Sequence, residues 1–176
     1  MLRIPNISEG RLNLADLKYA TLSERELTDL ALVAGDILMI RSNGSPKLVG
    51  RSVLVSSAVE GMAYAGYLMR LRVDPEVITP WFLELALASP DVRQQVEMPL
   101  RSTSGVNNIN TGEVRSLRIV VPPLEEQEEI VQRAQHLMQA MDQIATRAEA
   151  ASNLLNQSSR SVLAKAFRGD LLAAGL

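Results

Sequence analysis

Residues 130–162 read IVQRAQHLMQAMDQIATRAEAASNLLNQSSRSV and contain neither glycine nor proline. Apolar or small residues recur in this stretch with alternating spacings of four and three positions. The repeat runs through Ile130, Ala134, Leu137, Met141, Ile144, Ala148, Ala151, Leu155, Ser158 and Val162. A heptad repeat that continues for more than four heptads predicts one long helix that packs against another helix.

Both ends of this stretch carry helix-boundary signals. Pro123 suits a first helical turn, and Gly169 is a natural stop. A helix of about 44 residues is about 65 Å long at about 1.5 Å per residue. A domain of about 120 residues has a radius of gyration of about 14 Å, so the rest of the chain is too small to cover such a helix. We therefore expect a partner helix, and the alternative is a lone, exposed amphipathic helix.

The residue composition and charge of the sequence change at Pro122-Pro123, just before this helix. Residues 1–121 mix glycine, proline, asparagine and short apolar runs, and they carry 13 basic and 13 acidic side chains. Residues 122–176 carry 5 basic and 7 acidic side chains. The sequence predicts a head over residues 1–121 and a long-helix segment over residues 122–176.

The head has the features of a mixed α+β domain. Apolar and β-branched runs predict strands, and Thr79-Pro80 and Ser89-Pro90 are start signals for helices. The predicted strands are 36–41, 53–55, 64–73 and 117–121, the predicted helices are 81–87 and 91–96, and a polar loop is predicted at 107–112. The expected fold class is therefore α+β, with one long coiled-coil helix after the head.

Composition excludes several classes of protein. The chain has 176 residues, of which 47% are hydrophobic and 22% charged, which excludes a disordered chain. It has no cysteine, which excludes disulfides, thiolate metal sites and cysteine nucleophiles. Aromatic residues make up 3%, too few for base-stacking platforms. With no membrane-length apolar run and no signal-peptide stretch, we expect a cytoplasmic protein that does not enter a membrane.

No catalytic constellation is visible. The chain lacks a Gly-rich phosphate loop and a Gly-x-Ser-x-Gly elbow. His136, the single histidine, lies beside Leu137 in the long helix and is interpreted as a surface residue. The helix dipole accounts for the acidic cluster of Glu125, Glu126, Glu128 and Glu129. We therefore predict no enzyme activity and no metal site.

Binding of nucleic acid is the better hypothesis. Residues 36–72 contain five basic and two acidic side chains, a local excess of three positive charges. Arginine pairs with guanine or phosphate and asparagine pairs with adenine, and two polar loops offer such groups. The candidate DNA contacts are Arg41, Asn43, Lys47, Arg51, Ser104, Asn107 and Asn108. The alternative is that these residues form ordinary solvated turns, which use the same residue types.

Several motifs occur together in this chain. Asn107-Asn108-Ile109-Asn110 precedes LRIVVPPLEEQ at 117–127, and SVLAKAFRGDL at 161–171 ends the long helix. Gly35-Asp36-Ile37-Leu38 adds an internal segment of the head. In this combination the sequence resembles the specificity subunits of type I restriction-modification systems, over nearly the whole chain.

The resemblance implies a recognition subunit that is not itself a catalyst. In this family, target recognition domains bind double-stranded DNA, and long helices hold those domains apart and dock the DNA methyltransferase subunits. The restriction subunit joins the same assembly, which serves host defence. S-adenosylmethionine and ATP belong to the partner subunits, so the resemblance implies no cofactor for this chain.

The chain departs from the family pattern in one respect. A usual member has two recognition domains and two long helices that pack antiparallel, whereas this chain has one of each. Only 34 residues precede Gly35, so the opening strands of a full recognition domain are expected to be missing. Two hypotheses follow: a half-sized subunit that pairs with itself or another specificity subunit, or a remnant that acts only as a coiled-coil interaction module without binding DNA.

Overall fold

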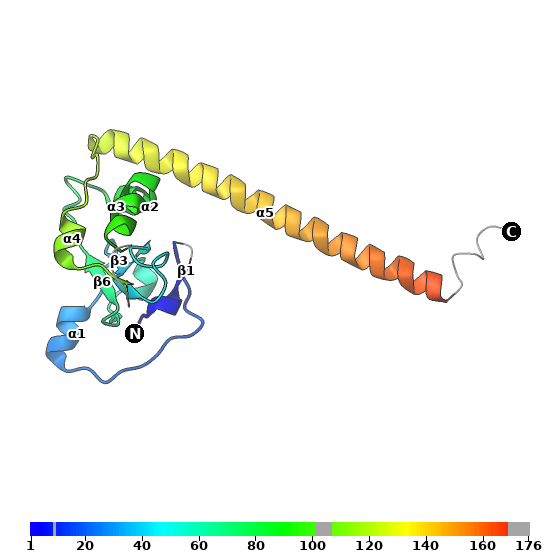
Figure 1. Cartoon of the computed structure of the whole chain (residues 1–176), viewed down its shortest axis with the longest axis horizontal. Helices are drawn as coiled ribbons and strands as arrows, with labels where there is room; N and C mark the ends of the chain where they lie inside the picture. Colours follow the sequence, from blue (N-terminus) through cyan, green and yellow to red (C-terminus); the bar gives the residue numbers. More distant parts are fainter. Residues whose placement is uncertain (9, 101–106, 169–176) are drawn as a thin grey trace. The chain divides into compact units, whose positions relative to one another are not determined.

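The computed structural model of the chain describes residues 1–8, 10–100 and 107–168. It contains two compact units, residues 1–131 and residues 132–176. The first unit mixes short strands and helices, and residues 132–167 of the second unit are helical (Figure 1). The predicted α+β class with one long helix is confirmed.

A three-stranded antiparallel sheet lies at the centre of the first unit. Its order is β5 (Ser52–Leu54), β3 (Ile37–Ile40) and β6 (Leu68–Leu71). All four residues of β3 are buried, because both faces of the sheet are covered. Leu38 and Ile40 pack into one apolar cluster, while Ile37 and Met39 pack into another on the opposite face.

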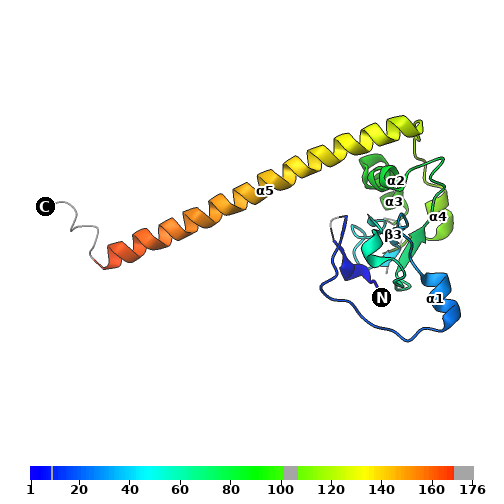
Figure 2. The ribbon, with the colours of Figure 1, turned by 180° about the vertical axis from the view of Figure 1, so that it is seen from behind.

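Two helices cover the face that carries Ile37 and Met39. They are α2 (Pro80–Ala88) and α3 (Pro90–Leu100), and both lie beside β3 in the view from behind (Figure 2). The Thr79 hydroxyl accepts a hydrogen bond from Phe82 N at 3.3 Å, as an N-cap residue does. The two predicted helix starts are confirmed.

The remaining elements of the head are short. They are η1 (Ile4–Asn6), β1 (Ile7–Ser8), β2 (Arg11–Leu12), α1 (Glu24–Leu30), β4 (Ser42–Asn43), η2 (Ser57–Val59), β7 (Asn107–Asn108) and α4 (Thr111–Arg115). β1 pairs with β2, and β4 pairs with β7, both antiparallel. The first of these pairs and α1 precede the segments that the sequence pattern had assigned.

Three predictions for the head are corrected. The strand expected at 64–73 begins at Leu68, because Leu68 N donates to Ala65 O and closes a turn. The loop expected at 107–112 contains β7 and the start of α4. The strand expected at 117–121 is wrong, because Arg118 N and O bond to the side chain of Gln95 and not to a neighbouring strand.

The helix α5 (Leu124–Phe167) is continuous over 44 residues, as the heptad repeat predicted (Figure 1). It begins where Pro123 O accepts hydrogen bonds from Glu126 N and Gln127 N, each at 3.0 Å. In the second unit the apolar stripe is open to solvent, with Leu137 67%, Met141 67% and Ile144 66% exposed. No helix in the described part of the chain is long and apolar enough to cross a membrane.

Candidate nucleic-acid interface

Strands β4 and β7 bring the two polar stretches of the sequence together. Ser42 lies opposite Asn108, and Asn43 lies opposite Asn107. More than 60 residues separate the partners along the chain, so no local pattern specifies this pairing. Three of the seven candidate DNA contacts are therefore neighbours on one small ladder.

The asparagines of this ladder differ in what they leave accessible. Asn107 is 7% exposed, and its Nδ2 donates to Gly44 O at 3.1 Å. Asn43 Oδ1 accepts a hydrogen bond from Ser45 N at 2.8 Å, which stabilises the turn after β4. Asn108 is exposed. The first two amides therefore shape the ladder, while Asn108 presents its amide to solvent.

Arg41 joins this ladder to the central sheet. Its N donates to Tyr67 O at 2.9 Å on the β6 side, and its O accepts from Ile109 N at 2.8 Å on the β7 side. Among the residues that the structure describes, neither the Arg41 guanidinium nor the Lys47 ammonium has a hydrogen-bond or ion-pair partner. Both cations are held by ordered backbone and remain available to a ligand.

Arg51 is placed at the same end of the sheet by a β-bulge. Gly50 N donates to Ile40 O and Ile40 N donates to Arg51 O, both at 2.8 Å. Gly50 and Arg51, which directly precede β5, therefore both lie opposite Ile40 of β3, as in a β-bulge. Gly50 has a φ of +76°, the left-handed conformation that glycine adopts at this position of a bulge. Arg51 Nε also donates to Lys47 O at 3.1 Å, which brings the two basic residues together.

The other two basic residues of the local positive excess have structural partners. Arg72 donates to both carboxylate oxygens of Asp36, at 2.6 and 2.8 Å. Asp36 is 1% exposed, and burial favours its neutral form. The hydrogen bonds from Arg72 and from Val33 N outweigh that burial and lower the pKa of Asp36. Arg70 donates to Ala31 O at 2.8 Å, just after α1. Of the five basic residues in 36–72, Arg41, Lys47 and Arg51 therefore remain for contact with a ligand.

Ser104, the remaining candidate contact, lies outside the described residues. Gly50 and Tyr67 were missed by the sequence interpretation, although both flank the basic residues in the structure. The Val-Gly-Arg run at 49–51 after a polar turn was a signal for the bulge. The position of Tyr67 had no local signal, because it depends on the register of β3 with β6.

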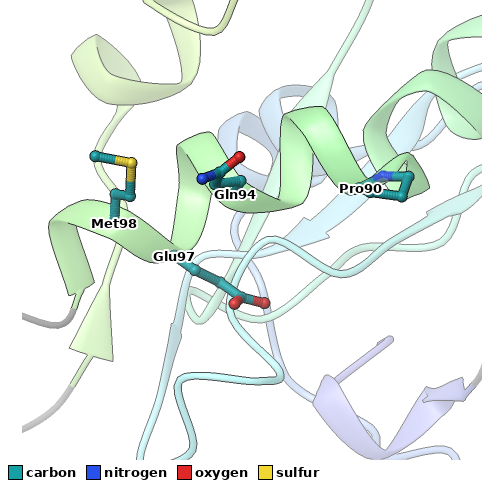
Figure 3. A pocket seen from close by; sticks show the side chains of 4 residues that line it. All are labelled: Pro90, Gln94, Glu97 and Met98. Carbon is teal, nitrogen blue, oxygen red and sulfur yellow. The ribbon is translucent and has the colours of Figure 1, made fainter.

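A hollow of about 300 Å³ lies along α3. Its lining residues, Pro90, Gln94, Glu97 and Met98, all come from that one helix (Figure 3). Glu97 Oε1 accepts a hydrogen bond from Arg93 at 3.0 Å. Within residues 1–8, 10–100 and 107–168, no group of three or more His, Cys, Asp or Glu side chains could hold a metal ion. This hollow assembles no chemistry that would mark a site.

Taken together, these features define a two-part α+β protein, with a compact head that ends in a basic, amide-lined ladder and a long helix with an apolar seam. Comparison with known proteins identifies its relatives. The chain is 33% identical over 174 residues to the type I restriction enzyme EcoKI specificity subunit of Escherichia coli K12, and the match covers 98% of this chain and 37% of the relative. The StySPI specificity subunit of Salmonella potsdam is 32% identical with the same coverage of each chain.

Solved structures agree with these relatives. The HsdS subunit from Thermoanaerobacter tengcongensis matches with a TM-score of 0.57 and 25% identity, over 68% of this chain and 30% of that one. A chain solved for the assembly and conformational transition of the type I R-M system matches with a TM-score of 0.58 and 27% identity, over the same shares. No protein-family model matches the chain. Over 98% of its length the chain matches specificity subunits of type I restriction enzymes, and it spans 37% of the length of the curated relatives named above.

Proposed function

We propose that this chain is a DNA-recognition unit of a type I restriction-modification complex. Its head binds double-stranded DNA with the end of the sheet formed around β4 and β7. The observation that carries this proposal is the convergence of Arg41, Lys47, Arg51 and Asn108, from two distant parts of the sequence, at one sheet end. Guanidinium and ammonium groups bind phosphates, and arginine and amide side chains recognise base edges.

The long helix supplies the second half of the proposal. Its exposed stripe pairs with the helix of a second specificity chain, and the paired helices dock the DNA methyltransferase subunit. The restriction subunit joins that assembly, and catalysis belongs to these partners. The first turns of α5 are acidic, with Glu125, Glu126, Glu128 and Glu129. Its last turns are basic, with Arg160 and Lys165, and Arg168 directly follows the helix. An antiparallel pair would place acidic ends beside basic ends, which favours that orientation.

The double substitution Arg41→Ala with Arg51→Ala tests the DNA interface. The probe is a fluorescently labelled 30-base-pair duplex of random sequence, and the readout is fluorescence anisotropy at several salt concentrations. If both arginines bind phosphates, the slope of log K against log salt should decrease by about two, with a loss of affinity of about 10- to 100-fold. A matched control, Lys18→Ala with Arg25→Ala, removes two exposed charges elsewhere in the head.

The control separates a local contact from a general charge effect. Equal losses in both double variants would assign binding to net charge alone and contradict the interface. Binding by the Arg41/Arg51 variant at the wild-type level would also contradict it. If wild-type protein binds no duplex, the chain acts only as an interaction module, which is the alternative function for this family member.

Three glutamates placed in the seam test the helix pairing. Leu137→Glu, Met141→Glu and Ile144→Glu should convert a helix-paired oligomer into a monomer at micromolar concentration, because charge at the core positions of a coiled coil is costly. Sedimentation velocity measures the change in mass. The control variant, Gln139→Glu with Thr146→Glu and Asn153→Glu, adds the same charge on the opposite face of the helix. A wild-type monomer, or an oligomer that survives the seam substitutions, would contradict pairing through this face.

A further inference from the structure

Tyr67 lies beside Arg41 at the end of the central sheet. It belongs to the turn that Leu68 N and Ala65 O close at 2.8 Å, immediately before β6. Its carbonyl oxygen accepts the hydrogen bond from Arg41 N at 2.9 Å. The register of β3 with β6 pairs Met39 with Met69 and Ile40 with Leu68, so the next pair in this ladder is Arg41 with Tyr67.

This register puts the two side chains on one face. Residues directly opposite each other in an antiparallel pair share a face, with Cβ atoms about 5 Å apart. Arg41 directly follows β3 and Tyr67 directly precedes β6, so this pair lies one position beyond the last strand pair, Ile40 with Leu68. Arg41 O does not return a bond to Tyr67, because it accepts from Ile109 N. Tyr67, Arg41 and β7 thus follow one another along this end of the sheet.

The side chain of Tyr67 is exposed to solvent, unlike an aromatic side chain in a protein core. Tyr67 is 64% exposed, whereas Tyr64 is half-buried with the Arg70 guanidinium 6.0 Å from its ring centroid. Exposed tyrosine presents a rigid apolar body and a hydroxyl at low entropic cost, which suits binding surfaces. Beside it, the Arg41 guanidinium has no partner within the described residues. The two residues together offer an adjacent cation and neutral donor.

We propose that Tyr67 is a further DNA-contacting residue, whose hydroxyl donates to a backbone phosphate next to the position that Arg41 contacts. Tyrosine is among the side chains that bind phosphate oxygens and so fix the register of a protein on the duplex. The contact would position the head and would carry no sequence information itself. This inference rests on the proposed function, since it requires the same end of the sheet to meet DNA.

Tyr67→Phe, which removes only the hydroxyl, tests the proposal on the full chain with the labelled random 30-base-pair duplex. A hydrogen bond to a charged acceptor lost in this way should weaken binding by about 10- to 100-fold. Because the hydroxyl is neutral, the slope of log K against log salt should stay unchanged, whereas loss of one phosphate-binding cation lowers it by about one. Tyr19→Phe, at a 97% exposed tyrosine elsewhere in the head, is the control.

The outcomes separate this inference from the function on which it rests. Wild-type binding by Tyr67→Phe, alongside weakened binding by the Arg41/Arg51 double variant, would overturn the role of Tyr67 and leave the DNA interface intact. Absence of duplex binding by the wild-type chain would overturn both. A lower melting temperature in Tyr67→Phe that accounts for the loss of binding would assign the hydroxyl to folding and overturn the proposal. Weakened binding with an unchanged salt slope and melting temperature would support it.

Discussion

Replacing Gln127 by leucine is expected to lower the free energy of unfolding of the head by about 2–4 kcal/mol, since three partly buried backbone groups lose their partners and each costs about 1 kcal/mol, the low end of the cost of a buried group. Gln127 is 0% exposed. Its Oε1 accepts from Thr79 N at 2.8 Å, and its Nε2 donates to Val77 O at 3.0 Å and to Pro122 O at 2.8 Å. Leucine has a similar size but can satisfy none of these three backbone groups.

The position of these contacts explains why losing them should destabilise both the start of α5 and the start of α2. Thr79 is the N-cap of α2, and Gln127 lies in the first turns of α5. One amide therefore fixes the start of the long helix against the cap of a core helix, within the first compact unit. These contacts give the glutamine of the PPLEEQ motif at 122–127 a structural role.

Urea unfolding followed by tryptophan fluorescence measures the effect, because Trp81 is the single tryptophan of the chain and lies in α2. The control is Gln132→Leu, which makes the same change at an exposed glutamine further along the helix. Gln127→Glu should also be destabilising, since a carboxylate cannot donate to two carbonyl groups and would be charged at a buried position. Unfolding midpoints of Gln127→Leu and Gln132→Leu that coincide would refute this account of the motif.

The long helix was predictable because its determinants are local. A heptad repeat, an acidic first turn and the absence of glycine and proline all act within a few residues of each other. The helix starts at Thr79 and Ser89 were predictable for the same reason. The failure at 117–121 is different, because an apolar run reads as a strand whether or not another strand is available to pair with it. Here the side chain of Gln95 bonds to the backbone of Arg118 in place of such a strand.

Only part of the candidate site could be predicted from the sequence. A count of charges over 36–72 treats five basic residues alike, and it cannot tell that Arg72 is neutralised by Asp36 while Arg41 is not. That distinction depends on pairing across 36 positions. The juxtaposition of Asn43 with Asn107, and of Arg41 with Tyr67, likewise follows from strand register. Residue types suggested nucleic-acid chemistry, and tertiary pairing selected which residues share a surface.

Replacing Gly50 by alanine is expected to destabilise the head by about 3 kcal/mol, from two separate costs. A side chain at φ +76° is strained by about 1–2 kcal/mol. A Cβ at this position would also lie 2.6 Å from Val96 Cγ1 and 3.0 Å from Arg93 Nη1. Overpacking of that kind costs about 1–3 kcal/mol. Val96 is buried and Arg93 donates to Val49 O at 2.9 Å, so neither neighbour can move without losing contacts.

Two other glycines separate these costs. Gly61 has the same φ of +76° with no atom within 4 Å of an added Cβ, so Gly61→Ala should show the backbone cost alone. Gly44→Ala has neither a positive φ nor a close neighbour and should be near neutral. In urea unfolding, Gly50→Ala should therefore have the lowest free energy of unfolding, Gly61→Ala an intermediate value and Gly44→Ala the highest. Equal stability of Gly50→Ala and Gly61→Ala would show that Val96 and Arg93 yield to the methyl group, and the steric argument would fail.

The same substitution links the packing of the head to the proposed interface. Gly50 is the bulge residue that sets Arg51 opposite Ile40, beside Lys47 and at the sheet end where Arg41 lies. At temperatures where Gly50→Ala is still folded, displacement of the bulge should weaken binding to the random duplex, whereas Gly61→Ala should bind as the wild type does. Duplex binding by folded Gly50→Ala at the wild-type level would show that the bulge serves packing against α3 and does not place Arg51 for DNA.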